Sequence, residues 1–212
     1  MFSIGAAFGS KKFKILNFLK KRKIKKPTKL IDNTGPKNVY HCSKKQDTVS
    51  LGIAALRNLS KITKLSNAKV LISVTETPKK FFPGNSFEYA SRLNLNKKTE
   101  LIDINSGCSG FLDALSLAYR LKKQTLIVCS ENYSSHMKSK SQSTFLLFSD
   151  AASAISINPK KFKILYDEVQ HQKNSFDLLC SDKNGLFMNG PEVFLFTKKL
   201  VIPMLKKVLL KY

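Results

Sequence analysis

The chain has 212 residues, of which 42% are hydrophobic and 10% aromatic, and this composition excludes a fully disordered protein because it can bury a core. Its formal net charge of +23, from 37 Lys and Arg against 14 Asp and Glu, favours a polyanionic partner without deciding between nucleic acid, anionic lipid and an acidic carrier protein. No apolar stretch approaches the roughly 20 residues that cross a membrane, and the apolar start precedes its lysines, the wrong order for a secretory signal, so we expect a cytoplasmic protein without a membrane span.

Residues 1–45 form the first predicted unit, a basic segment with the first strand and a connection. It holds 13 Lys and Arg against one acidic residue, Asp32. Phe13, Leu16 and Leu19 fall at helical spacing, so a basic amphipathic helix on a membrane surface is one interpretation of residues 13–24. A solvated surface helix or loop accounts for the same pattern and is the more common case.

Residues 46–190 form the second predicted unit, in which helices and strands alternate. A helix is predicted over residues 45–60, because Ser43 and Gln46 have the spacing of a capping box ahead of an apolar helical face. The further predicted elements are strands at 69–75, 101–105 and 125–129 and helices at 85–93 and 109–121. Parallel strands need helical crossovers, so this order predicts a layered α/β domain with a largely parallel sheet.

Further elements are predicted after residue 150. Residues 151–157 and 163–169 have the pattern of two more strands. Residues 191–210 have the pattern of a helix with Pro191 in its first turn, which Pro203 should kink or shorten. This helix belongs to the third predicted unit, residues 191–212.

The four cysteines, Cys42, Cys108, Cys129 and Cys180, show no CxxC pair and no Cys and His at metal-ligand spacing. Neither a metal site nor a disulfide framework is therefore predicted. Cys108 stands out, because residues 103–111 (Asp-Ile-Asn-Ser-Gly-Cys-Ser-Gly-Phe) place it between a predicted buried strand and the first turn of a helix. The amides and dipole at a helix start lower a thiol pKa, so we interpret Cys108 as a nucleophile rather than as a buried packing residue.

Residues 103–111 resemble the nucleophile motif of β-ketoacyl-acyl carrier protein synthase III, a thiolase-fold condensing enzyme. Three other stretches agree with that family in order and spacing: Thr-Glu-Thr-Pro at 75–78 followed by Pro83, Ser-Glu at 130–131, and Met-Asn-Gly-Pro-Glu-Val-Phe at 188–194. The resemblance implies a thiolase-like layered α/β fold, about one half of the duplicated fold together with the first helix of the second half. It also implies that Cys108 accepts an acyl group from a thioester.

The chain departs from the family pattern at three places. The family's catalytic histidine and asparagine motifs have no position within these residues, and His41, His136 and His171 do not match the histidine motif. Residues 147–154 (Leu-Phe-Ser-Asp-Ala-Ala-Ser-Ala) carry side chains where the family has three glycines, so a changed backbone or tolerated strain is expected. Residues 33–36 (Asn-Thr-Gly-Pro) lack the arginine of the family's coenzyme A contact region.

Three functions compete. The first is a 3-oxoacyl-acyl carrier protein synthase III-like acyltransferase of fatty acid or related acyl-chain biosynthesis, which needs no cofactor and uses acyl-coenzyme A or an acyl carrier protein thioester as substrate. Its expected partners are the typically acidic acyl carrier protein, docked on the lysine-rich surface, and a second copy or second half-chain. The second is a truncated, non-catalytic or split-enzyme partner. A basic nucleic-acid-binding protein ranks last, because no nucleic-acid-binding motif accompanies the charge.

Overall fold

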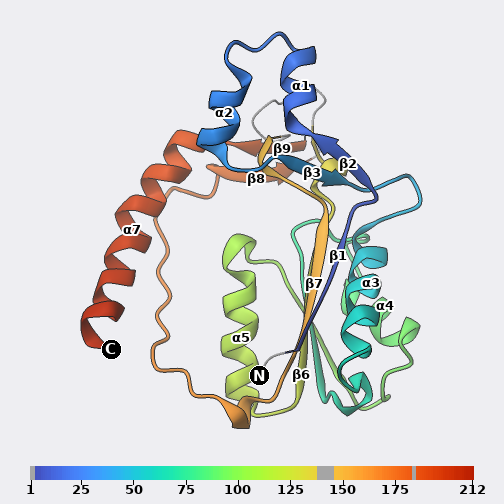
Figure 1. Cartoon of the computed structure of the whole chain (residues 1–212). Helices are drawn as coiled ribbons and strands as arrows, with labels where there is room; N and C mark the ends of the chain where they lie inside the picture. The colour runs from blue at the N-terminus through green and yellow to red at the C-terminus, as the bar shows by residue number, and fades with distance from the viewer. Residues whose placement is uncertain (1–2, 138–145, 183–184) are drawn as a thin grey trace.

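The computed structural model describes residues 3–137, 146–182 and 185–212, and its centre is a mixed five-stranded sheet (Figure 1). Its strands stand in the order β1-β7-β6-β4-β5. Their bounds are β1 Ser3–Phe8, β4 Val70–Val74, β5 Glu100–Ile104, β6 Thr125–Glu131 and β7 Ala151–Ile157. β4 runs parallel to β5 and β6, whereas β7 runs antiparallel to β6 and β1. The predictions of strands at 69–75, 101–105, 125–129 and 151–157 are confirmed.

Helices cover both faces of the sheet (Figure 1). α3 (Thr48–Ser60) and α4 (Asn85–Arg92) lie on one face, where buried residues of α3 pack against Leu71, Leu126 and Val128. α5 (Gly110–Leu121) lies on the other face, with Ala114 and Ala118 against β4 and β6. Both faces of the central strands are therefore buried, which is why those strands are continuously apolar in sequence. The connections contain four short 3₁₀ helices: η1 (Leu65–Asn67), η2 (Gly107–Ser109), η3 (Tyr133–Ser135) and η4 (Pro159–Lys161).

α3 begins later than the capping spacing predicted. Its N-cap is Asp47, whose carboxylate accepts a hydrogen bond from the Ser50 amide at 2.7 Å, while the Ser50 hydroxyl accepts one from the Asp47 amide at 2.8 Å. Ser43 and Gln46 instead stabilise the preceding turn, in which the Ser43 amide donates to Gln46 Oε1 at 3.1 Å. The helix start was misplaced because a carboxylate next to the first turn satisfies its amides directly.

The basic N-terminal unit folds onto one end of the sheet. β2 (Lys11–Lys14) pairs antiparallel with β3 (Asn38–His41), and α1 (Ile15–Lys21) and α2 (Pro27–Thr34) lie between them in sequence. The apolar sides of both helices form a small core, made of Ile15, Leu19, Ile31, Val39 and Leu146. We call residues 15–34 the basic lobe. The membrane-surface helix over residues 13–24 is not what forms, because α1 is shorter and buries its apolar side within the protein.

The predicted strand at residues 163–169 is wrong. This segment has no strand partner among the described residues, and its side chains bond to helices or to one another. The Asp167 carboxylate accepts from the Ser116 hydroxyl at 2.6 Å and from the Arg120 guanidinium at 3.1 Å, both on α5. Its apolar run at residues 164–166 (Ile-Leu-Tyr) has the composition of a strand but lies in the connection that follows η4. A hairpin of β8 (Leu179–Asp182) and β9 (Gly185–Met188) follows, which the sequence analysis did not predict.

The last helix, α7 (Gly190–Lys211), stands apart from the sheet (Figure 1). It starts as predicted, with Pro191 in its first turn and Asn189 as N-cap. It continues through Pro203, so this residue does not shorten the helix, and the other predicted effect of Pro203, a kink, stays a prediction. No residue of α7 is buried, and apolar side chains such as Phe194 (67% exposed) and Leu209 (79% exposed) face outward. In the parts of the chain that the structure describes, no helix is long and apolar enough to cross a membrane.

Candidate active site

Cys108 lies where the parallel strands end. β4, β5 and β6 run in the same direction, so their carboxyl ends meet at one edge of the sheet, and β5 leads there into η2 and then α5. Gly107 has φ +56°, a left-handed conformation that disfavours side chains, and a Cβ on Gly110 would lie 2.6 Å from Val74 Cγ1. A side chain would be strained at the first glycine and would clash at the second, and Cys108 lies exposed between them.

Two carboxylates and a tyrosine stand beside this turn. Glu131, at the end of β6, accepts hydrogen bonds from the Glu76 amide at 2.8 Å and from the Thr77 hydroxyl at 2.6 Å. The Glu76 carboxylate accepts from the Tyr133 hydroxyl at 2.7 Å, and its Oε1 would be 3.4 Å from a Cβ placed on Gly107. Glu131 therefore holds the loop after β4, and that loop places Glu76 against the cysteine turn.

The surroundings change the acidity of this cluster. Burial raises the pKa of Glu131 to about 7, and the neighbouring Glu76 carboxylate acts in the same direction, although hydrogen bonds from Thr77 and the Glu76 amide oppose them. Burial also raises the pKa of the Tyr133 hydroxyl, with Glu131 and Glu76 adding to the effect. At neutral pH Glu131 is consequently poised between its protonated and ionised forms.

The expectation that the helix start lowers the pKa of Cys108 is wrong. Desolvation raises the pKa of its thiol, and the negative charges of Glu76 and Glu131 raise it further, whereas a backbone hydrogen bond lowers it. The cysteine sits in a 3₁₀ turn before α5, and desolvation together with the two carboxylates outweighs the backbone hydrogen bond. Two of the other thiols are shifted in the same direction: burial raises the pKa of Cys42 to about 12 and that of Cys129 to about 11.

The other residues singled out in the sequence lie elsewhere. His41 packs its ring 4.9 Å from that of Phe13, His136 uses its carbonyl to accept from the Leu186 amide, and His171 lies exposed in the loop before β8. Within the described ranges, no group of three His, Cys, Asp or Glu side chains could hold a metal ion.

The two other departures from the family pattern have structural outcomes. Residues 149–154 adopt no positive φ, so the side chains at the three glycine positions are accommodated in ordinary backbone conformations, and Ser149 Oγ accepts from the Tyr40 amide at 3.1 Å. The strain of a left-handed backbone is therefore not found here, and the changed backbone stays a prediction. Of residues 33–36, the side chains of Asn33 and Thr34 lie outside the described residues, and Gly35 caps α2 with φ +88°.

Comparison with known proteins agrees with this geometry. The family model described as 3-Oxoacyl-[acyl-carrier-protein (ACP)] synthase III matches residues 102–171, which include Cys108. Beta-ketoacyl-[acyl-carrier-protein] synthase III of Coxiella burnetii (strain CbuK_Q154) is 26% identical over 164 residues, covering 70% of this chain and 51% of the relative. The protein of that name from Bartonella bacilliformis is 28% identical over 190 residues, covering 78% and 58%. The chain thus spans about half the length of the curated relatives it matches.

A solved structure extends the similarity over nearly the whole chain. The 3-oxoacyl-[acyl-carrier-protein] synthase III from Aquifex aeolicus VF5 gives a TM-score of 0.80 at 25% identity, covering 92% of this chain and 65% of that one. The mixed sheet between helical layers places this chain among the thiolase-fold proteins, as residues 103–111 predicted. Within that class it is similar to 3-oxoacyl-[acyl-carrier-protein] synthase III, to which the family model, the curated relatives and the solved structure all point.

Proposed function

We propose that the chain is the acyl-accepting part of a 3-oxoacyl-acyl carrier protein synthase III-like acyltransferase of fatty acid or related acyl-chain biosynthesis. The observation that carries this proposal is the exposed Cys108 on a glycine-flanked turn between β5 and α5, inside the stretch matched by the family model. An inert packing role fits poorly with an exposed cysteine at the carboxyl ends of parallel strands. The non-catalytic alternative is the less favoured of the two.

The reaction can be written for the residues present. The Cys108 thiol loses its proton, and the thiolate attacks the carbonyl carbon of an acyl thioester. The new C–S bond forms as the bond between the acyl group and the donor sulfur breaks, and the released thiolate takes up a proton. Backbone amides of the glycine-flanked turn are the donors we assign to the thioester oxygen. The donors are acyl-coenzyme A or an acyl carrier protein thioester, and we expect the reaction in the cytoplasm.

The proposal also includes a second polypeptide, which covers exposed apolar surface of this chain. α5 leaves Leu112 64% exposed, and α7 buries none of its residues. β5 is an edge strand, and Phe81 and Phe82, in the loop between β4 and α4, are almost entirely exposed. Apolar surface of this extent marks an interaction site, so we infer that a second copy or a second half-chain covers it. Self-association in analytical ultracentrifugation supports the second copy, and a strictly monomeric chain supports the half-chain.

The acyl transfer is tested by intact-protein mass spectrometry after incubation with acetyl-coenzyme A. The expected result is one added acetyl group on the wild type and on Cys180→Ala, and none on Cys108→Ala. Cys180→Ala is the matched control, because it also removes one thiol. Acetylation that persists in Cys108→Ala at the wild-type rate would remove the nucleophile from the proposal.

A further inference from the structure

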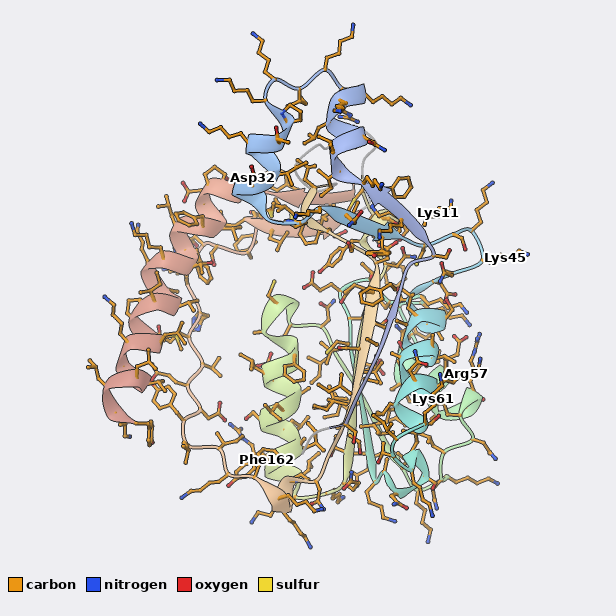
Figure 2. All side chains as sticks on the ribbon, viewed as in Figure 1. Lys11, Asp32, Lys45, Arg57, Lys61 and Phe162 are labelled. Carbon is orange, nitrogen blue, oxygen red and sulfur yellow. The ribbon has the colours of Figure 1, made fainter. Side chains whose placement is uncertain are left out.

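The basic lobe is a concentrated positive surface. Seven basic residues lie in its outer half, and all are exposed: Lys20, Lys21, Arg22, Lys23, Lys25, Lys26 and Lys29. The lobe contains one acidic residue, Asp32, and no ion pair joins any of its six lysines listed above to a carboxylate among the described residues. Side chains ending in nitrogen extend outward from the α1–α2 connection, with Asp32 further down α2 (Figure 2). The field of this surface is therefore largely uncompensated.

The backbone of the lobe carries lysine where other residues would be more stable. Lys23 and Lys26 have φ values of +54° and +50°. The left-handed region costs a residue with a Cβ roughly 1 kcal/mol or more, and glycine or asparagine would avoid much of this cost. Lys23 and Lys26 thus hold charged side chains at turn positions where glycine would be less strained.

The apolar sides of the lobe helices are already occupied. Ile15, Leu19 and Ile31 are buried in the core beneath the lobe. On the remaining side of α1, the Arg22 guanidinium lies over the Phe18 ring, 4.7 Å from its centroid. The lobe therefore offers charge without an apolar face to insert into lipid, which favours an acidic protein surface over a membrane.

The lobe lies at the end of the sheet that carries Cys108. Glu131 of β6 pairs with Ala151 of β7, and Ala151 pairs with Phe8, the last residue of β1. The chain continues from Phe8 into β2 and the lobe, while the parallel strand β5 ends at the same edge and leads to Cys108. In Figure 1 the lobe caps this end of the molecule, and α5 starts on the same side.

We propose that the basic lobe is a docking surface for an acidic carrier protein that delivers the acyl group to Cys108. The inference rests on the proposed function, because it assigns a surface to the carrier in that reaction. Charge complementarity of this kind chiefly accelerates association and orients the partner, and it weakens with salt.

The test is a pair of charge-reversal variants of the full chain. The lobe variant carries Lys20→Glu, Lys21→Glu, Lys23→Glu and Lys25→Glu. The control carries the same number of reversals at exposed lysines toward the opposite end of the sheet: Lys64→Glu, Lys97→Glu, Lys98→Glu and Lys160→Glu. Binding of recombinant apo-acyl carrier protein is measured at low and at physiological salt, and circular dichroism checks that both variants are folded.

We expect the lobe variant to lose at least tenfold in carrier affinity at low salt, and the control to stay within twofold of the wild type. Equal losses in both variants, or no loss in the lobe variant, would overturn the docking surface. Tighter binding of duplex DNA or of phosphatidylglycerol vesicles than of the carrier would also overturn it, by assigning the lobe to another polyanion. Acetylation of Cys108 by acetyl-coenzyme A is measured in parallel, so failure of the proposed function is seen separately from failure of docking.

Discussion

Replacing Glu131 by glutamine should change how the stability of the fold depends on pH. Burial raises the pKa of this carboxyl from its ordinary value of 4.5 to about 7 in the folded chain. A folded-state pKa above the unfolded value means that the protonated form stabilises the fold. This contribution is fully present below about pH 4.5 and is lost as the pH rises through about 7. At about 1.4 kcal/mol per pH unit, the interval corresponds to roughly 3 kcal/mol.

Glutamine keeps the shape of the side chain and an oxygen acceptor for the Glu76 amide, which donates to it at 2.8 Å, but it does not titrate. Urea unfolding at several pH values gives the free energy of unfolding of the two proteins. We expect the wild-type value minus that of Glu131→Gln to fall by roughly 3 kcal/mol between pH 4 and pH 8. Burial lowers the pKa of His41, which gives the opposite pH trend, but this effect is common to both proteins and cancels. Parallel curves would refute a buried, protonated Glu131.

Three further outcomes are expected. Iodoacetamide should label Cys108 before Cys42 and Cys129, because Cys108 is exposed and burial raises the pKa of the other two to about 12 and about 11. Peptide mapping that finds Cys42 or Cys129 labelled first would contradict this. Glu76→Gln should speed that labelling at pH 7 by removing a negative charge that raises the Cys108 pKa, whereas Glu100→Gln, at the far end of β5, should not; equal rates in all three proteins would exclude the effect. Gly110→Ala should cost about 1–3 kcal/mol in thermal or urea unfolding because its Cβ would meet Val74, while Gly190→Ala, whose nearest atom would be 4.0 Å away, should change little; similar losses in both variants would point to another cause.

The central strands could be predicted because burial on both faces leaves a continuous apolar signal. β4 is buried at every position, and β7 was predicted with the bounds observed. A first strand was expected within residues 1–45, but the bounds of β1 (Ser-Ile-Gly-Ala-Ala-Phe) could not be given, because its small residues pack against α3, where a Cβ on Gly5 would clash with the helix backbone. The error at residues 163–169 has the opposite origin, since a short apolar run (Ile-Leu-Tyr at 164–166) has the composition of a strand but finds no strand partner among the described residues.

The position of the candidate site could be predicted from the sequence, but its electrostatics could not. The glycine spacing around Cys108 located the turn, because left-handed backbone and close helix approach both restrict residue choice. The carboxylates that raise the Cys108 pKa could not be placed beside it, since Glu76 and Glu131 follow or end two other strands. A glutamate directly after β4 and another ending β6 could have been noted as neighbours at the carboxyl edge, once those strands were taken as parallel.

The position of the transferred acyl group tests the central claim most directly. The wild-type chain is incubated with acetyl-coenzyme A, digested at mildly acidic pH and mapped by mass spectrometry, with and without neutral hydroxylamine, which cleaves thioesters. The acyltransferase account predicts acetyl on the peptide that contains Cys108, lost on hydroxylamine treatment. Acetyl found on Cys180 or on lysine, with the Cys108 peptide unmodified, would contradict it.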